Sequence, residues 1–155
     1  MRQTQDERML GEIDISQIKI DTKSRDDIPQ ILRGLQYLYT DTEIREKLFT
    51  ALEKIIPTNV DKTNGRPGMT LWRIFVLGVL RLDLNCDYDR LQSLANNYKT
   101  LREMLGHGIF EEDYYYELQT LKDNVRLLTP EALAEINQVV VESGHKLVKK
   151  KRRTR

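Results

Sequence analysis

The segment from Leu71 to Leu84 constrains the fold of this chain most strongly. Its apolar side chains lie on more than one face of a helix, namely Leu71, Trp72, Phe75, Val76, Val79 and Leu80. A surface helix carries one apolar stripe, so a helix that is apolar on several faces must be buried. Thr70 is a suitable N-cap for it, and Gly78 allows a neighbouring helix to approach closely. The segment therefore predicts a central helix that other helices cover.

The rest of the chain carries single apolar stripes at helical spacing. The expected helices are Asp27 to about Tyr39, Asp41 to about Ile55, Asp87 to Ala95, Leu101 to Leu105, about Glu112 to Arg126, and Pro130 to Gly144. Several have sequence signals at their ends, such as the caps Asp27, Asp41 and Asp87 and the terminating Gly106. No strand pattern and no internal repeat is evident. The fold class expected is all-α, a short helical bundle.

The pattern divides the chain into five parts. Residues 1–26 are a polar arm, either extended or a single helical turn, and residues 27–56 form a helical hairpin. Residues 57–69 are rich in proline, glycine and asparagine, which marks a loop and a boundary between two helical units. Residues 70–145 form the second helical region, and residues 146–155 form a basic linker or tail.

The charge of the chain is unevenly distributed. The formal net charge is +1, from 25 lysines and arginines and 24 aspartates and glutamates. Seven of the basic residues lie in 146–155, so residues 1–145 have a net charge of −6. An acidic body with a basic tail is unlike a uniformly basic nucleic-acid binder. Any contact with DNA must therefore come from a local patch or from the tail.

Residues that would support catalysis or metal binding are few. Cys86 is the only cysteine, and His107 and His145 are the only histidines, which excludes an intrachain disulfide and a zinc site. No nucleophile–base motif is present, and the acids at 111–113 lack a predicted rigid scaffold for magnesium. We expect no catalytic residue, no metal site and no cofactor. The longest apolar run is too short to cross a bilayer, so we expect a cytoplasmic protein with no membrane partner.

The stretch DYDRLQSLANNYKTLREMLG, residues 87–106, has helix–turn–helix proportions, with Asn96 and Asn97 as the expected turn. In that motif the first residues of the second helix reach the edges of DNA bases. Here Arg102 would pair with guanine, and Lys99 and Thr100 would contact phosphates. The alternative is an ordinary helical hairpin with a solvated, charged face.

Two further segments are ambiguous on sequence alone. The basic run of the tail, Lys149, Lys150, Lys151, Arg152 and Arg153, is suited to phosphate contacts or to a solvated linker. The three consecutive tyrosines at 114–116 have rings that can stack on bases, but at least one should pack in the core.

Three long strings resemble DDE-type insertion-sequence transposases outside the major families (ISNCY-like). They are SRDDIPQILRGLQYLY at 24–39, GRPGMTLWRIFVLGVLRLDLNCDYDRLQSLANNYKTLREMLGH at 65–107, and YELQTLKDNVRLLTPEALAEINQVVVESGHKLVKK at 116–150. Together they cover nearly the whole chain.

The resemblance implies an N-terminal helical region that binds the terminal inverted repeats of the element and helps to pair subunits. In such transposases a ribonuclease-H-like domain follows, with an Asp, Asp and Glu set that holds magnesium. The stretch matching His145 to Lys151 would precede its first catalytic aspartate, so no catalytic residue is expected here. The resemblance places the DNA-binding residues at Arg90, Lys99, Thr100 and Arg102, and makes the basic tail a linker between domains.

The expected function is thus recognition of double-stranded DNA at transposon ends, with subunit pairing, in a bacterial cytoplasm and at the nucleoid when DNA is bound. The expected partners are that DNA and either a second copy or an intact transposase. A rival interpretation is a helical interaction module that pairs with or inhibits an intact transposase without contacting DNA, and its acidic body favours it. A third is a decayed transposase remnant, although each predicted helix retains its cap and apolar stripe.

Overall fold

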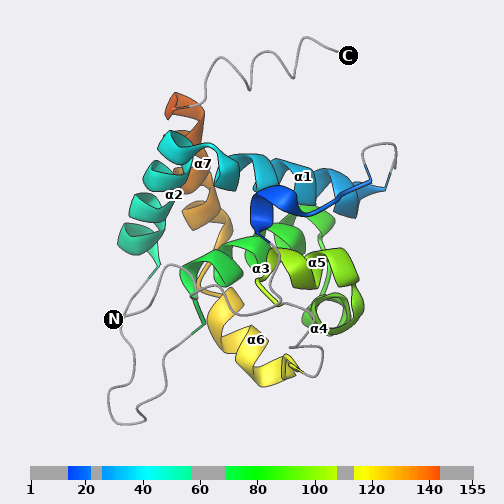
Figure 1. The fold of residues 1–155 in the computed structure, drawn as a ribbon. Coiled ribbons are helices and arrows are strands. Elements are labelled where there is room, and N and C mark those ends of the chain that lie inside the picture. Colours follow the sequence, from blue (N-terminus) through cyan, green and yellow to red (C-terminus); the bar gives the residue numbers. More distant parts are fainter. Residues whose placement is uncertain (1–13, 22–25, 57–68, 108–113, 144–155) are drawn as a thin grey trace.

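The computed structural model describes residues 14–21, 26–56, 69–107 and 114–143 (Figure 1). These residues form helices and connecting segments and contain no strand, which confirms the all-α expectation. A short 3₁₀ turn, η1, is followed by seven α-helices within the described ranges. Their bounds are η1 Ile15–Gln17, α1 Asp27–Thr40, α2 Thr42–Ile55, α3 Leu71–Leu84, α4 Tyr88–Asn97, α5 Lys99–Met104, α6 Leu118–Val125 and α7 Pro130–Ser143.

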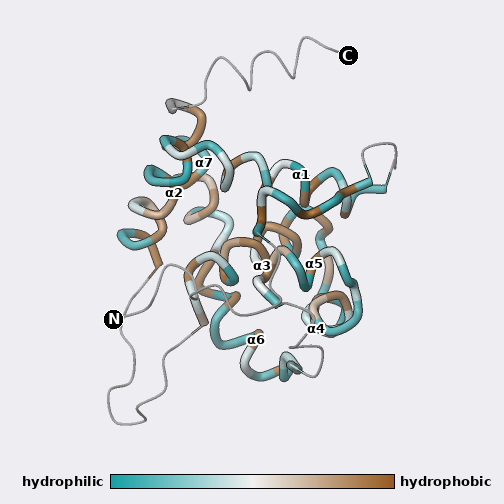
Figure 2. Tube along the Cα trace, in the orientation of Figure 1, coloured by the Kyte–Doolittle hydropathy of each residue, from teal (hydrophilic) through white to brown (hydrophobic). Residues whose placement is uncertain are grey.

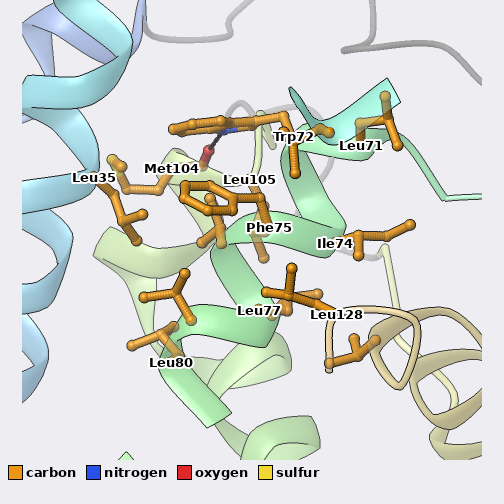
Figure 3. Close-up of a cluster of buried hydrophobic side chains, with 14 of the residues drawn as sticks. Leu35, Leu71, Trp72, Ile74, Phe75, Leu77, Leu80, Met104, Leu105 and Leu128 are labelled. Carbon is orange, nitrogen blue, oxygen red and sulfur yellow. Dashed lines mark hydrogen bonds between the residues drawn. The ribbon is translucent and has the colours of Figure 1, made fainter. Parts of the chain in front are cut away.

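Helix α3 is the centre of the fold, as its apolar sequence predicts. Every position from Leu71 to Leu80 is buried except Arg73. The apolar colouring of α3 contrasts with the mixed colouring of α1 and α2 (Figure 2). Helices α1, α2, α4 and α6 all contact it. Figure 3 shows side chains of α3, among them Trp72, Phe75 and Leu80, together with side chains of α1, of α5 and of the segments after α5 and α6, namely Leu35, Met104, Leu105 and Leu128.

Gly78 is the point at which α3 meets the segment after α6. A Cβ added at Gly78 would overlap Cδ2 of Leu128, which is itself fully buried. The absence of a side chain therefore makes room for Leu128. The close neighbour at Gly78 is thus a side chain of this connecting segment and not the helix expected from the sequence.

The short N-terminal turn η1 is docked on α1. Ile15 and Ile18 are buried, and the amide Nε2 of Gln36 donates hydrogen bonds to the carbonyl oxygens of both, at 2.9 and 2.8 Å. Of the two forms expected for this arm, residues 15–17 adopt the single helical turn, whereas Ile18 after them has an extended backbone.

Side-chain caps fix several helix starts where the sequence predicts them. The Asp41, Thr70 and Asp87 side chains accept hydrogen bonds from the backbone amides of Ile44, Arg73 and Arg90 respectively. At α1, in contrast, the cap position is Asp26 rather than Asp27, and its side chain makes no capping hydrogen bond. The three caps satisfy backbone amides that a helix start leaves without an intrahelical acceptor.

The expectation of a helix from about Glu112 is wrong in its described part. Residues 114–117 are not helical, and α6 begins only at Leu118. The physical reason is tertiary: Tyr116 is 1% exposed, and side chains of α4 hold its backbone in place.

The regions 27–56 and 70–145 share one hydrophobic core. Helix α7, late in the chain, packs most extensively on α2, to which it is antiparallel (Figure 1). Ile136 and Val140 of α7 belong to the same buried cluster as Leu48 and Leu52 of α2. Residues 57–68 and 144–155, which include the expected loop and basic tail, lie outside the described residues.

Candidate nucleic-acid interface

The hairpin of α4 and α5 is tighter than a helix–turn–helix. Asn96 and Asn97, expected as its turn, are the last residues of α4, and only Tyr98 separates α4 from α5. Tyr98 has an extended backbone, and its amide still donates to the carbonyl of Leu94. The second helix, with six residues, is about 9 Å long. The hairpin therefore presents a short α5 rather than a long recognition helix.

The C-terminal end of α5 is closed by backbone and side-chain hydrogen bonds. The amide of Gly106 donates to the carbonyl of Glu103 and the amide of His107 to that of Arg102, the pattern of a Schellman motif. Gly106 has φ 95°, which confirms its expected role in ending the helix. The first turn of α3 contributes Trp72 Nε1, which donates to Met104 at 2.8 Å (Figure 3), and Arg73 Nε, which donates to Leu105 at 2.9 Å.

Arg102, the predicted base-reading residue, has its guanidinium bonded within the fold. Its Nη1 donates to the carbonyl of Ala95 at 3.0 Å, and its Nη2 to the carbonyl of Tyr114 at 2.9 Å. One bond covers a carbonyl near the end of α4, and the other fixes the 114–116 segment. Base reading by Arg102 stays a prediction, but contact with guanine would require both hydrogen bonds to be exchanged.

The other predicted DNA-binding residues of the hairpin are more accessible. Arg90 on α4 and Lys99 at the start of α5 are exposed, and Thr100 is half-buried. The exposed carboxylates Asp87 and Asp89 lie beside Arg90 in the sequence, so this face carries both signs of charge. The basic run Lys149–Arg153 lies outside the described residues.

The sequence did not indicate the buried polar cluster next to the hairpin. The His107 Nε2 and the Tyr116 hydroxyl share a hydrogen bond of 2.6 Å, and the Tyr114 ring stacks on the imidazole at a centroid distance of 4.5 Å. On the other side of the segment, the Asn96 side chain accepts from the amide of Tyr116 at 2.7 Å and donates to its carbonyl at 3.1 Å. The Asn96 side chain thus makes the same two hydrogen bonds to the backbone of Tyr116 that a residue of a neighbouring β-strand would make.

Burial dominates the electrostatics of this cluster. Desolvation lowers the pKa of His107 to about 3, and the positive charges of Arg73 and Arg102 act in the same direction. The imidazole is therefore neutral at physiological pH and acts as a packing and hydrogen-bonding group. The only sign in the sequence is that His107 precedes three tyrosines, and nearness in sequence does not by itself bring these rings together. Tyr116 packs in the core, as expected for one of the three.

A second surface feature is a groove between α2 and α7. It is open to solvent and has a volume of about 1240 Å³, and the side chains that line it include the small and aliphatic Ala51, Ile55, Ala132 and Val139. Ala51 and Ala132 are buried, while Ile55 and Val139 are half-buried. The sequence expectations did not include this groove because α2 ends at Ile55 and α7 begins only at Pro130.

Groups that would support other chemistry are sparse in the described residues. No cluster of three histidine, cysteine, aspartate or glutamate side chains suited to a metal ion occurs among them. The acids at 111–113 lie outside these ranges. Burial raises the pKa of the half-buried Cys86 thiol, which opposes formation of a reactive thiolate. No helix in the described part of the chain is long and apolar enough to cross a membrane.

Comparison of the chain with protein-family models, with curated proteins and with solved structures gives no match.

Proposed function

We propose that this chain is the DNA-binding and subunit-pairing part of a DDE-type transposase, and that the α4–α5 hairpin contacts the transposon end. The three long strings that resemble such transposases support the proposal. The string at 65–107 contains the α4–α5 hairpin, and the string at 116–150 contains α7. No catalytic role is proposed for any residue of this chain. Magnesium belongs to the catalytic domain that the resemblance implies, and no cofactor is proposed here.

The observation that carries the proposal is the exposure of Arg90 and Lys99 on the α4–α5 hairpin. Leu91, Ala95 and Leu101 anchor the two helices in the core, so the basic side chains project from a fixed frame. Phosphate contacts position a protein on a duplex and need exposed cations of this kind. We assign Arg90 and Lys99 to phosphate contacts, together with Thr100. We assign base contact to Arg102 in a bound state that exchanges its internal hydrogen bonds.

The test is fluorescence anisotropy with duplexes from the DNA that flanks the gene, against shuffled duplexes, over a salt series. Binding to one flank at least tenfold tighter, about 1.4 kcal/mol, is expected. Arg90→Ala and Lys99→Ala should each weaken binding to all duplexes and reduce the salt slope by about one. Lys122→Ala, at an exposed position of α6, is the matched control and should change neither quantity.

Two outcomes would overturn this assignment. Equal affinity for flanking and shuffled duplexes would leave only nonspecific binding and remove recognition of the transposon end. Unchanged affinity and salt slope in Arg90→Ala and Lys99→Ala would remove the hairpin from the interface. Arg102→Ala is a poorer first test, because it also removes two hydrogen bonds that hold the fold.

A second candidate function is an interaction module that pairs with intact transposase without contacting DNA. The described residues include 12 lysines and arginines and 17 aspartates and glutamates, an acidic excess that opposes general DNA affinity. The α2–α7 groove gives such a module a surface. Absence of binding to every duplex, combined with a defined dimer or a complex with the transposase, would favour this function.

A further inference from the structure

We propose that a small polar hollow between α4 and residues 114–115 binds one unpaired base of a DNA strand, stacked on the ring of Tyr115. The hollow is open to solvent and has a volume of about 300 Å³. The inference rests on the proposed function, because it places this base beside the hairpin that contacts DNA. Three observations support it: an exposed ring that is held in place, hydrogen-bond acceptors on α4, and the charges around the hollow.

The ring of Tyr115 is exposed but fixed in position. It is 62% exposed, the largest value among the exposed large hydrophobic side chains of the described residues. Its hydroxyl accepts a hydrogen bond from Nε2 of Gln92 at 3.1 Å, and the backbone on either side of it is bonded to side chains of α4 and α5. The other ring of the hollow, Tyr114, already stacks on His107. Tyr115 therefore offers a ring on which a flat partner can stack at little further cost in conformational entropy.

The side chains of α4 that line the hollow present hydrogen-bond acceptors. Asp89 is exposed, and its carboxylate can only accept. Asn97 donates through Nδ2 to the carbonyl of Ser93 at 3.0 Å, which leaves its Oδ1 as an acceptor. Such oxygens pair with the exocyclic amino group of adenine or cytosine, which thymine lacks. The hollow should therefore prefer a base that carries an amino group.

The charges around the hollow suit a neutral ring that is joined to an anion. Asp89, which lines the hollow, disfavours a phosphate inside it, whereas Arg90, the next residue of α4, is exposed and attracts one. Lys99 is exposed two residues beyond Asn97, at the start of α5. The two cations also oppose the entry of a lysine or arginine side chain from a protein partner. A nucleotide meets these conditions, because its base is neutral and its phosphate stays outside with the cations.

The base that enters the hollow must be unpaired. In a duplex the faces of each base are covered by its neighbours, and its pairing edge is bonded to the opposite strand. Stacking on Tyr115 needs a free face, and the acceptors of α4 need a free amino group. Single-stranded DNA therefore supplies the probe for this site.

The test is fluorescence anisotropy with short strands of abasic phosphodiester units that carry one central adenine, cytosine or thymine, or no base. Tyr115→Ala should weaken binding of the adenine and cytosine strands by about tenfold or more and leave the base-free strand unchanged. Tyr115→Phe keeps the ring and should retain most of the affinity. Tyr37→Ala, which removes an exposed ring from α1, is the matched control and should change nothing. Arg90→Ala should weaken binding of all four strands, because it acts on phosphates.

Several outcomes would overturn this inference. They are equal binding by the wild type of strands with and without a base, no binding of any strand, and a Tyr115→Ala variant that binds as the wild type does. A Tyr115→Phe variant as weak as Tyr115→Ala would exclude stacking, and thymine bound as tightly as adenine would exclude the acceptors of α4.

Failure of the hollow is distinguishable from failure of the proposed function. If the hollow alone is wrong, preference for the flanking duplex persists, as do the effects of Arg90→Ala and Lys99→Ala on duplex binding. Base-dependent binding of single strands without any preference among duplexes would instead retain the hollow and remove recognition of the transposon end.

Discussion

Gly78 and Gly34 occupy helix interiors with opposite surroundings. At Gly78 a Cβ would overlap the Leu128 side chain, whereas at Gly34 on α1 no atom lies within 4 Å of a Cβ. Gly78→Ala should lower the free energy of unfolding by about 1–3 kcal/mol, the usual cost of overpacking a core. Gly34→Ala should raise it by roughly 0.5–1 kcal/mol, because alanine loses less backbone entropy than glycine in a helix. Urea denaturation of both variants measures the two values, and a neutral Gly78→Ala would contradict the close approach.

His107 gives the fold a dependence on acid. Its pKa is about 3 in the folded state, against an ordinary value of 6.5. Between pH 6.5 and pH 3, His107 binds a proton in the unfolded chain but stays neutral in the folded chain. The free energy of unfolding therefore falls as the pH decreases toward 3. The stabilisation is fully present above pH 6.5, and the loss is at most about 1.4 kcal/mol per pH unit.

The matched measurement compares wild type with His107→Gln by urea denaturation between neutral pH and about pH 4. The variant should be less stable at neutral pH, because it disturbs the contact with Tyr116, but its stability should decline less steeply with acid. Equal slopes in the two proteins would show that His107 does not titrate differently in the folded state.

Two helices are terminated by a residue in the left-handed backbone conformation. The two residues should respond differently to substitution. Helix α5 is followed by Gly106 at φ 95°, and α3 by Asn85 at φ 50°. Gly106→Ala should destabilise the protein by about 1–2 kcal/mol, because a Cβ is unfavourable in this conformation. Asn85→Gly should be neutral or slightly stabilising. Thermal unfolding of the pair measures both, and an unaffected Gly106→Ala would contradict the Schellman geometry at α5.

At the scale of the elements, helix starts are the part of the fold most accessible to prediction from sequence. Capping side chains accept hydrogen bonds from backbone amides in the same turn, as Thr70, Asp87 and Asp41 do. Their role therefore depends only on residues that are close in the sequence. The segment 114–117 could not be predicted in the same way. Its conformation depends on Asn96 and His107, which lie before it in the chain and contact it only after folding.

The internal bonding of the candidate site could not be predicted from the sequence. The structure shows Arg90 and Lys99 exposed, as the phosphate contacts expected of them require. The sequence contained no sign that Arg102 donates to the carbonyls of Ala95 and Tyr114, because a basic residue in a short helix gives the same sequence pattern whether its side chain points to solvent or into the fold. The contact of α2 with α7 could not be predicted either, because helical periodicity identifies the apolar face of a helix but not the helix that packs against it.

At the scale of the whole molecule, the shared core predicts cooperative unfolding. Buried residues from η1 through α7 form one cluster, and α7 completes the surface of α2. Far-ultraviolet circular dichroism, which reports helices, and near-ultraviolet circular dichroism, which reports aromatic packing, should therefore give coincident urea transitions. Two separated transitions would show that residues 27–56 and the later helices unfold as independent units.

The position of Trp72 has an optical consequence. It is the only tryptophan of the chain, it is 2% exposed, and its ring contacts Tyr39 of α1, Phe49 of α2 and Phe75 of α3. Its indole N–H is bonded to the last residue of α5. Its fluorescence should be blue-shifted and shielded from aqueous quenchers, and it should receive excitation energy from the adjacent tyrosine. Without any added label, emission from this one residue therefore reports displacement of α1, α2 or α5 when the protein binds DNA or another copy of itself.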